Sequence, residues 1–174
     1  MSALKDNLSP DSLKALVSAK EECQNQASKK KCSSNAKTTL PPIEVGNIYK
    51  IEADERNGIT PPRGRKTWYK HFAVMGIADD GSLMGCVVFD SKKNRDHVEP
   101  GYDEFFIAIA PGKYPFIDHD SCLDCLKLKP ATLSNIRHGK AEGRLTEEDL
   151  QNALKLTKKS NRNSSITLRI YNIA

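Results

Sequence analysis

The chain has 174 residues, with 27 lysines and arginines against 22 aspartates and glutamates, which gives a formal net charge of +5 at pH 7. This length fits one domain with an appended arm and excludes a large multidomain enzyme, while the modest positive excess favours an anionic partner but is also explained by solubility alone. No apolar run approaches the roughly 18 residues that cross a bilayer, and the polar start MSALKDNLSPDSLK lacks the apolar core of a secretion signal, so we expect a cytoplasmic protein without membrane contact.

The first 40 residues differ in pattern from the rest of the chain. A serine before Pro10 provides an N-cap ahead of a first-turn proline, and apolar residues then recur at helical spacing, which predicts a helix over about Pro10–Gln26. The stretch NQASKKKCSSNAKTTLPP that follows is polar and basic, which is typical of a linker. We therefore expect an N-terminal helical arm and linker over residues 1–40 and a separate domain over residues 41–174.

From residue 41 onward, short apolar or alternating segments are separated by turn residues. The segments are rich in Val, Ile, Phe, Tyr and Leu, several of which strands favour. Such a series of short strands predicts a β-barrel or a β-sandwich. The expected strands cover Glu44–Glu52, Trp68–Ala78, Leu83–Asp90, Glu104–Ala110 and Ser121–Lys129.

The C-terminal part of the chain changes to helical spacing. Thr146 provides an N-cap with an acidic residue three positions on, and leucines occupy the hydrophobic-staple positions around it. A helix over about Glu147–Lys158 should therefore pack on the strands, after a weaker helical turn over about 132–137. The last segment alternates apolar and polar residues, which predicts a closing strand through Ile166, Leu168 and Ile170.

The dipeptide Asp80-Gly81 separates two of the expected strands. It is a strong signal for a two-residue type I′ turn, because both central residues of that turn need positive φ. Counting outward from this turn places His71 opposite Asp90, with facing Cβ atoms about 4.5–5.5 Å apart. The next pair is Lys70 and Ser91, which should project to the other side of the sheet because neighbouring positions alternate between faces. An ordinary ion pair at the end of a hairpin, which contributes little when exposed, explains the same pattern.

The connection between the first two expected strands is long and basic. Its second half, TPPRGRKTWYKH, contains no acid and holds Arg63, Arg65 and Lys66, followed by Trp68. A groove for single-stranded nucleic acid combines cations that meet phosphates with aromatic rings that stack on bases. These four residues therefore predict a nucleic-acid-binding segment. The alternative is a solvated basic loop whose aromatic residues turn into the core.

The sequence favours free thiols and no metal site. Five cysteines are an odd number without a repeating framework, which is typical of a reducing compartment. Cys122 and Cys125 are spaced like a zinc knuckle, but on a strand their side chains face opposite sides, and no second pair completes a tetrahedral site. We expect buried structural cysteines and no metal or other cofactor. His97, His119 and His138 are further candidates for acid–base roles, but each lies in a polar or turn context that is typical of a solvated surface side chain.

Several segments match a known family in pattern and in order. Residues 45–49 (VGNIY) match an opening strand, and residues 70–75 (KHFAVM) match an Arg-Pro-x-x-Val-Ile strand. Further on, residues 120–123 (DSCL) match an Asp-Ser-Val-Ile strand start. Residues 143–150 (GRLTEEDL) match a Gly-x-Leu-Ser/Thr-x-Glu-Asp helix start, the most specific of these segments. Together the segments resemble the PemK/MazF toxin family, sequence-specific endoribonucleases of bacterial toxin–antitoxin systems.

The resemblance implies a fold, an activity and partners. The fold would be mainly β with α, a small SH3-like antiparallel barrel with a C-terminal helix. The activity would be metal-independent cleavage of single-stranded RNA by a homodimer that an antitoxin protein keeps inactive. The family's catalytic arginine falls on Lys70, and its catalytic threonine falls on Ser91 or Asp90. Lysine keeps the charge but lacks the guanidinium fork that grips a phosphate through two bonds.

Cleavage of this kind uses the RNA 2′-hydroxyl as nucleophile, and it needs a base, an acid and positive charge near the phosphate. His71 beside Asp90 would supply the base or the acid, since a carboxylate neighbour raises the pKa of an imidazole. Lys70 and Arg65 would stabilise the phosphate, and Ser91 would orient it. The alternative function is a catalytically inactive barrel that binds nucleic acid or protein as a regulatory module, which the lysine at position 70 favours.

Overall fold

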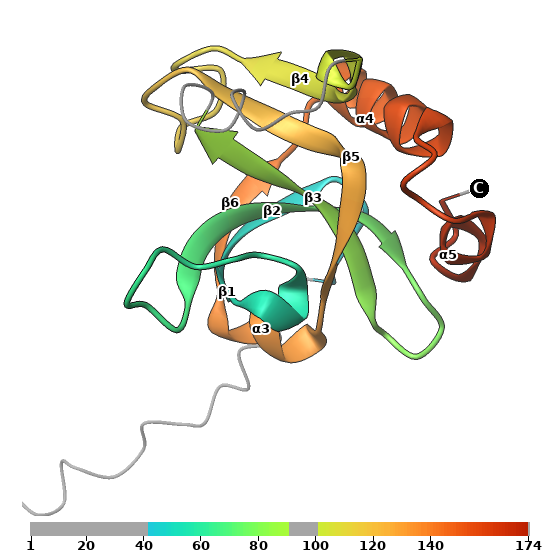
Figure 1. The fold of residues 1–174 in the computed structure, drawn as a ribbon, viewed down its shortest axis with the longest axis horizontal. Coiled ribbons are helices and arrows are strands. Elements are labelled where there is room, and N and C mark those ends of the chain that lie inside the picture. The colour runs from blue at the N-terminus through green and yellow to red at the C-terminus, as the bar shows by residue number, and fades with distance from the viewer. Residues whose placement is uncertain (1–41, 91–100, 174) are drawn as a thin grey trace, which may run out of the picture. The chain divides into compact units, whose positions relative to one another are not determined.

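The computed structural model of this protein describes residues 42–90 and 101–173 (Figure 1). The expected arm and linker over residues 1–40, including the helix over Pro10–Gln26, lie outside the described residues, as does Ser91.

The strands of the described chain form one antiparallel six-stranded sheet in the order β4-β5-β3-β2-β1-β6. Three helices and two short 3₁₀ turns, η2 and η4, accompany the sheet, which curls strongly (Figure 1). The described part of the chain is therefore mainly β with helices, as the sequence predicts. The strands are β1 (Asn47–Ala53), β2 (Trp68–Ile77), β3 (Leu83–Asp90), β4 (Phe106–Ile109), β5 (Ser121–Ala131) and β6 (Lys140–Arg144). The remaining elements are η2 (Glu55–Asn57), η4 (Asp103–Phe105), α3 (Leu133–His138), α4 (Glu147–Lys159) and α5 (Ser165–Ile170).

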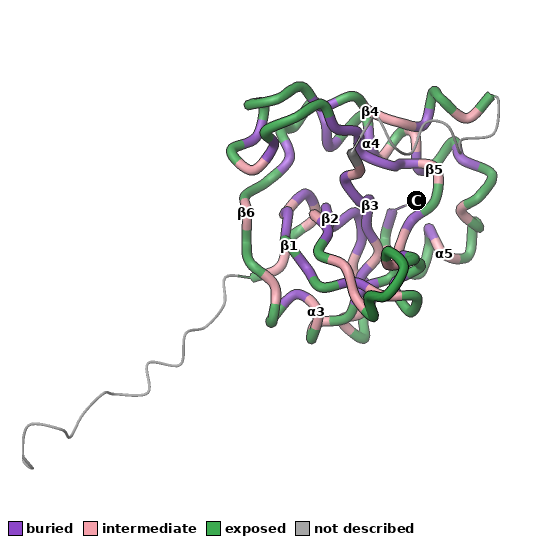
Figure 2. The backbone as a smooth tube through the Cα atoms, turned by 60° about the vertical axis from the view of Figure 1, so that its left-hand side comes forward, coloured by how far each residue is buried: buried purple, intermediate pink, exposed green. Residues whose placement is uncertain are grey.

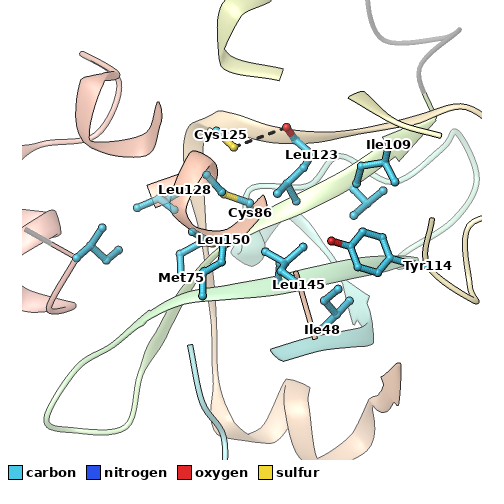
Figure 3. Close-up of a cluster of buried hydrophobic side chains, with 14 of the residues drawn as sticks. Ile48, Met75, Cys86, Ile109, Tyr114, Leu123, Cys125, Leu128, Leu145 and Leu150 are labelled. Atoms are coloured by element: carbon cyan, nitrogen blue, oxygen red, sulfur yellow. Dashed lines mark hydrogen bonds between the residues drawn. The ribbon is translucent and has the colours of Figure 1, made fainter. Parts of the chain in front are cut away.

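The central strands are largely buried (Figure 2). Their apolar side chains pack in two clusters, one on each face of the sheet. Along β2, Ala73 and Met75 belong to a cluster that α4 covers, which we call the α4 core (Figure 3). Phe72 and Val74 point to the opposite face and belong to a second cluster beside α3, the α3 core. Burial on both faces explains why the central strands are apolar without a break, since each side chain meets one core or the other.

The C-terminal helix forms where the sequence predicts it. The Thr146 hydroxyl oxygen accepts a hydrogen bond from the Asp149 N–H at 3.2 Å, so α4 begins at the expected N-cap. Leu150 and Ala153 share a buried face of this helix and pack in the α4 core. The predicted strand at Leu83–Asp90 also has the observed bounds of β3.

The closing strand predicted through Ile166, Leu168 and Ile170 is wrong, because this segment is the helix α5. Ser164 caps the helix by accepting a hydrogen bond from the Thr167 N–H at 3.0 Å. Only Leu168 of the three apolar residues is buried, whereas Ile166 and Ile170 are exposed. The sequence reading also missed β6, whose residues KAEGR lack strand-forming apolar side chains and occupy a sheet edge.

The predicted register of the β2–β3 hairpin is also wrong. The Gly81 N–H bonds to the Ala78 carbonyl at 2.9 Å, and the Ala78 N–H bonds to the Ser82 carbonyl at 3.0 Å, so the turn holds one more residue than a type I′ turn. Gly81 has φ of 81°, and Asp80 has no positive φ, which the type I′ turn would require. The register shifts again between Val74 and Gly76, a bulge that adds to the difference.

The consequence is a change of partner at the end of the hairpin. His71 faces Val88 rather than Asp90. The backbone of Asp90, the last residue of β3, pairs with Ser121 of β5. The predicted partner of Lys70, Ser91, lies outside the described residues.

Candidate active site

A pocket of about 250 Å³ lies at the start of β2. We call it the β2 pocket. Its lining comes from four successive β2 residues, from the end of β3, from the connection between β4 and β5, and from the first residue of β5. The lining residues are Trp68, Tyr69, Lys70, His71, Val88, Phe89, Phe116, Ile117, His119 and Ser121. Two predicted catalytic residues, Lys70 and His71, therefore lie in one pocket.

Lys70 is on the α3-core face of the sheet and is only 7% exposed. Its strand partner in β1 is Ile51, a member of the α3 core. The ammonium Nζ lies 3.3 Å from the centroid of the Trp68 ring and 4.8 Å from that of Phe89. Both rings attract the cation through their electron-rich faces. Aromatic side chains thus hold the positive charge inside the pocket lining.

His71 projects from the opposite face of β2. Its ring centroid lies 4.6 Å from that of Phe116 on the β4–β5 connection. Burial lowers the pKa of His71, and Lys50, Lys70 and Lys140 lower it further, against an opposing effect of Glu142. The sequence predicts the opposite direction, because it places the Asp90 carboxylate opposite His71, whereas the observed register places Val88 there. A lowered pKa keeps the imidazole neutral near pH 7, which is the form a general base needs.

The other two predicted catalytic residues are at the boundary of the described chain. Asp90 ends β3, and its side chain is outside the described residues, like the whole of Ser91. Their assigned roles remain predictions.

The basic segment before β2 is a surface loop. Arg63, Arg65 and Lys66 are all exposed. The Arg65 N–H bonds to the Pro62 carbonyl at 3.0 Å, in a turn where Gly64 has φ of 85°. Lys66 lies two residues before Trp68, the first residue of β2, so this loop leads into the strand that lines the β2 pocket.

The exposed aromatic residue is Tyr69 rather than Trp68. Trp68 is half-buried beneath the Lys70 ammonium, while Tyr69 is 61% exposed. Lys50 of the neighbouring strand places its Nζ 6.0 Å from the Tyr69 ring centroid. The sequence could have predicted that Tyr69 lies on the same face of β2 as His71, because the two residues are two positions apart on a strand.

The sequence did not assign several other residues of this region to the site. Phe116, His119 and Ser121 reach the pocket from the far side of β3, and Lys140 reaches the surroundings of His71 from β6. No local pattern connects these segments to β2, so only the strand order brings them together. His119 was expected to be a solvated surface residue, and its side chain is indeed 58% exposed, but it also lines the pocket.

The described cysteines are structural. Cys86, Cys122 and Cys125 are buried free thiols. A hydrogen bond with Cys125, together with burial, raises the pKa of Cys86 well above its ordinary value, so this thiol stays protonated and unreactive. Within residues 42–90 and 101–173, no three His, Cys, Asp or Glu side chains gather as a metal site would require.

Two further cavities flank α3, with volumes of about 350 and 200 Å³. Their shared residues are Arg56, Ser134 and Asn135. Asn135 accepts from the Thr132 N–H and side chain in the capping box of α3, and Arg56 is paired with Asp54. The hydrogen bonds and the ion pair of these residues stabilise η2 and α3, so their polar side chains have a structural role that needs no ligand.

Comparison with protein-family models finds no match, and comparison with curated proteins finds no significant relative. No helix in the described part of the chain has both the length and the apolar character needed to cross a bilayer.

Proposed function

We propose that this chain is a PemK/MazF-like toxin that cleaves single-stranded RNA without a metal ion, in the cytoplasm, as part of a toxin–antitoxin or defence system. The observation that carries this proposal is the β2 pocket, where a lysine and a neutral histidine lie together on the strand that follows an exposed cationic loop. An antiparallel, strongly curled sheet followed by α4 supports an SH3-like barrel of that family's kind.

The pocket residues suit an internal attack on a phosphodiester. His71 takes the proton of the 2′-hydroxyl, the 2′-oxygen forms a bond to phosphorus, and the bond from phosphorus to the 5′-oxygen breaks. Lys70 stabilises the extra negative charge on the phosphate in the transition state. The products are a 2′,3′-cyclic phosphate and a 5′-hydroxyl, once an acid has protonated the leaving oxygen.

The surface around the pocket suits a single strand. Arg63, Arg65 and Lys66 offer charge to the phosphates, and the exposed Tyr69 ring offers a stacking surface for a base. Trp68, which the sequence predicts to bind nucleic acid, lines the β2 pocket and also holds the Lys70 ammonium against its ring.

The test is cleavage of a mixed-sequence RNA by the full chain in the presence of a metal chelator. We expect fragments that end in a 2′,3′-cyclic phosphate. His71→Gln and Lys70→Met should each reduce the rate at least 100-fold, in line with the loss of one acid–base or charge-stabilising group. Methionine preserves the buried stem volume of Lys70, and His138→Gln, at an exposed α3 histidine, is the matched control. Unchanged rates in both pocket variants would dismiss the proposed active site.

One observation favours the alternative of a silent binding module. The Lys70 side chain is almost fully buried against Trp68 and Phe89, so aromatic rings partly cover its ammonium group. Lysine also lacks the guanidinium fork with which arginine binds a phosphate. A module of this kind would bind RNA in a salt-sensitive way and leave it intact. Binding with no fragments under the same conditions would therefore select the alternative.

The partners follow from the same proposal. We infer a homodimer and an antitoxin whose acidic segment occupies the exposed loop of Arg63, Arg65 and Lys66. Expression of the chain should arrest growth, and co-expression of an acidic protein encoded beside it should restore growth. Growth that continues at full expression would count against a toxin.

A further inference from the structure

We propose that His119 is the second acid–base residue of the β2 pocket, which donates the proton to the leaving 5′-oxygen while His71 takes the proton of the 2′-hydroxyl. This inference rests on the proposed ribonuclease function, because it assigns the acid that such a cleavage needs.

The first support is position. His119 lies in the connection between β4 and β5 and lines the same pocket as His71 of β2. The same connection presses Phe116 against the His71 ring at a centroid distance of 4.6 Å, so the segment that carries His119 lies directly against His71. Ser121 donates a hydrogen bond from its hydroxyl to the His119 carbonyl at 3.1 Å, which ties this backbone to the start of β5.

The second support is orientation. His119 Nδ1 is hydrogen-bonded to the Asp118 carboxylate, which fixes one ring nitrogen and leaves Nε2 as the atom to meet a substrate oxygen. The hydrogen bond with His119 lowers the pKa of Asp118, so this carboxylate remains ionised beside the ring. A base oriented by a carboxylate in this way is the usual arrangement of a catalytic imidazole.

The third support is the contrast between the two histidines. Among the groups that act on His71, Lys50, Lys70 and Lys140 lower its pKa and Glu142 raises it. His119 has Asp118 in contact and Asp120 next in the chain. The cations around His71 favour its neutral ring, whereas the ring of His119 is hydrogen-bonded to a carboxylate. Paired groups in opposite environments are how one site supplies both a base and an acid.

The proton balance of the reaction is complete with these residues. His71 gains the 2′ proton as the bond from the 2′-oxygen to phosphorus forms, and His119 loses a proton to the 5′-oxygen as its bond to phosphorus breaks. Solvent then returns both imidazoles to their starting forms, and no other reactant is required.

The experiment uses the full chain and two RNA substrates. One is ordinary RNA, and the other carries sulfur in place of the bridging 5′-oxygen at the scissile phosphate, so that a thiolate leaves without needing a proton. We expect His119→Gln to slow cleavage of ordinary RNA by 100-fold to 10,000-fold and to cleave the sulfur substrate at nearly the wild-type rate. His71→Gln should be slow on both substrates. The pH profile of kcat/KM should lose its alkaline limb in His119→Gln and its acid limb in His71→Gln.

Asp118→Asn and His138→Gln complete the set. Asp118→Asn preserves size and should give an intermediate loss on ordinary RNA, again relieved by sulfur. His138→Gln should match the wild type on both substrates. Because His119 and Asp118 are exposed, these variants should keep the wild-type thermal unfolding midpoint.

The outcomes separate this inference from the function it rests on. Wild-type cleavage together with full activity of His119→Gln, or a loss that sulfur does not relieve, overturns the role of His119 and leaves the ribonuclease proposal standing. A wild-type chain that cleaves neither substrate overturns both.

Discussion

Two adjacent residues of β2 meet opposite surroundings. The Lys70 ammonium lies on aromatic rings on the α3-core face, whereas the His71 imidazole lies against Phe116 on the other face. A strand separates neighbouring side chains in this way without any special sequence. At its end, where both faces open into one pocket, the two groups can serve a single substrate.

The lowered pKa of His71 predicts a pH effect on stability. The folded chain holds this imidazole with a pKa below the ordinary 6.5, mainly because it is buried. Between the two pKa values the unfolded chain binds more protons, so this stabilisation is complete above pH 6.5 and falls as the pH drops toward the folded-state pKa.

We therefore expect His71→Gln to lose less stability than the wild type between pH 7 and pH 5. Urea unfolding at a series of pH values measures the difference. Because both proteins share every other titrating group, identical pH dependence in the two would show that His71 is not desolvated.

At the level of elements, Gly85 allows β3 to lie close to β2. A Cβ at this position would lie 2.3 Å from the Ala73 carbonyl oxygen and 2.5 Å from the Phe72 ring. Gly85→Ala should therefore destabilise the fold by about 3 kcal/mol, as for overpacking against groups that cannot move away. Denaturant unfolding measures this value.

Gly112→Ala separates crowding from backbone strain. Gly112 has φ of 78° and open space around the position of a Cβ. We expect its substitution to cost only about 1 kcal/mol, the penalty of a left-handed alanine. Equal losses in the two variants would show that crowding at Gly85 is absent.

A buried carboxylate joins α4 to the β4–β5 connection. Asp149 accepts hydrogen bonds from Lys113 Nζ at 2.7 Å and from the Tyr114 hydroxyl at 2.5 Å. Burial would raise the pKa of Asp149, but the hydrogen bonds from Lys113 and Tyr114 lower it overall. The resulting stabilisation is present above the ordinary pKa of 3.8 and is lost as the pH falls through the lowered value.

Asp149→Asn should destabilise the fold by about 2 kcal/mol at pH 7, because it removes charge-assisted hydrogen bonds from a buried site. The loss relative to the wild type should shrink below pH 3.8, where the wild-type carboxylate also becomes neutral. Glu147→Gln, at an exposed position in the same helical turn, is the control for helix-end charge and should cost under 1 kcal/mol. A loss at Asp149 that does not exceed the control would contradict this role.

At the scale of the whole molecule, the exposed loop before β2 should set the salt dependence of RNA binding. Replacement of Arg63, Arg65 and Lys66 by Gln removes three cations from this loop. If all three meet phosphates, the slope of log Kobs against log salt should become shallower by about 2, at about 0.7 per single-strand phosphate contact. Fluorescence anisotropy with a single-stranded RNA at several salt concentrations measures the slope.

The control is a triple variant that removes the same number of positive charges from α4. Lys155, Lys158 and Lys159 are exposed on that helix, and their replacement by Gln should leave the slope nearly unchanged. Equal effects of the two triple variants would mean that net charge, rather than the loop, governs binding.

The sequence by itself determined the elements that local physics controls. β3 and α4 form at or within one residue of their predicted bounds, because apolar runs and the Thr146 cap act over a few neighbouring residues. The sequence did not predict the polar edge strand β6, because an edge strand needs no apolar pattern. It also did not predict the helix α5, in which Leu168 is the one buried residue.

Only the tertiary structure decided which side chains share the β2 pocket. The Gly81 turn and the bulge near Met75 reset the pairing, so His71 faces Val88 instead of Asp90. The strand order then brought Phe116 and His119 to this end of β2, through the pairing of β5 with β3. A shift of one residue reassigns every cross-strand partner, and contacts between distant segments follow from packing of the whole sheet, which no local pattern records.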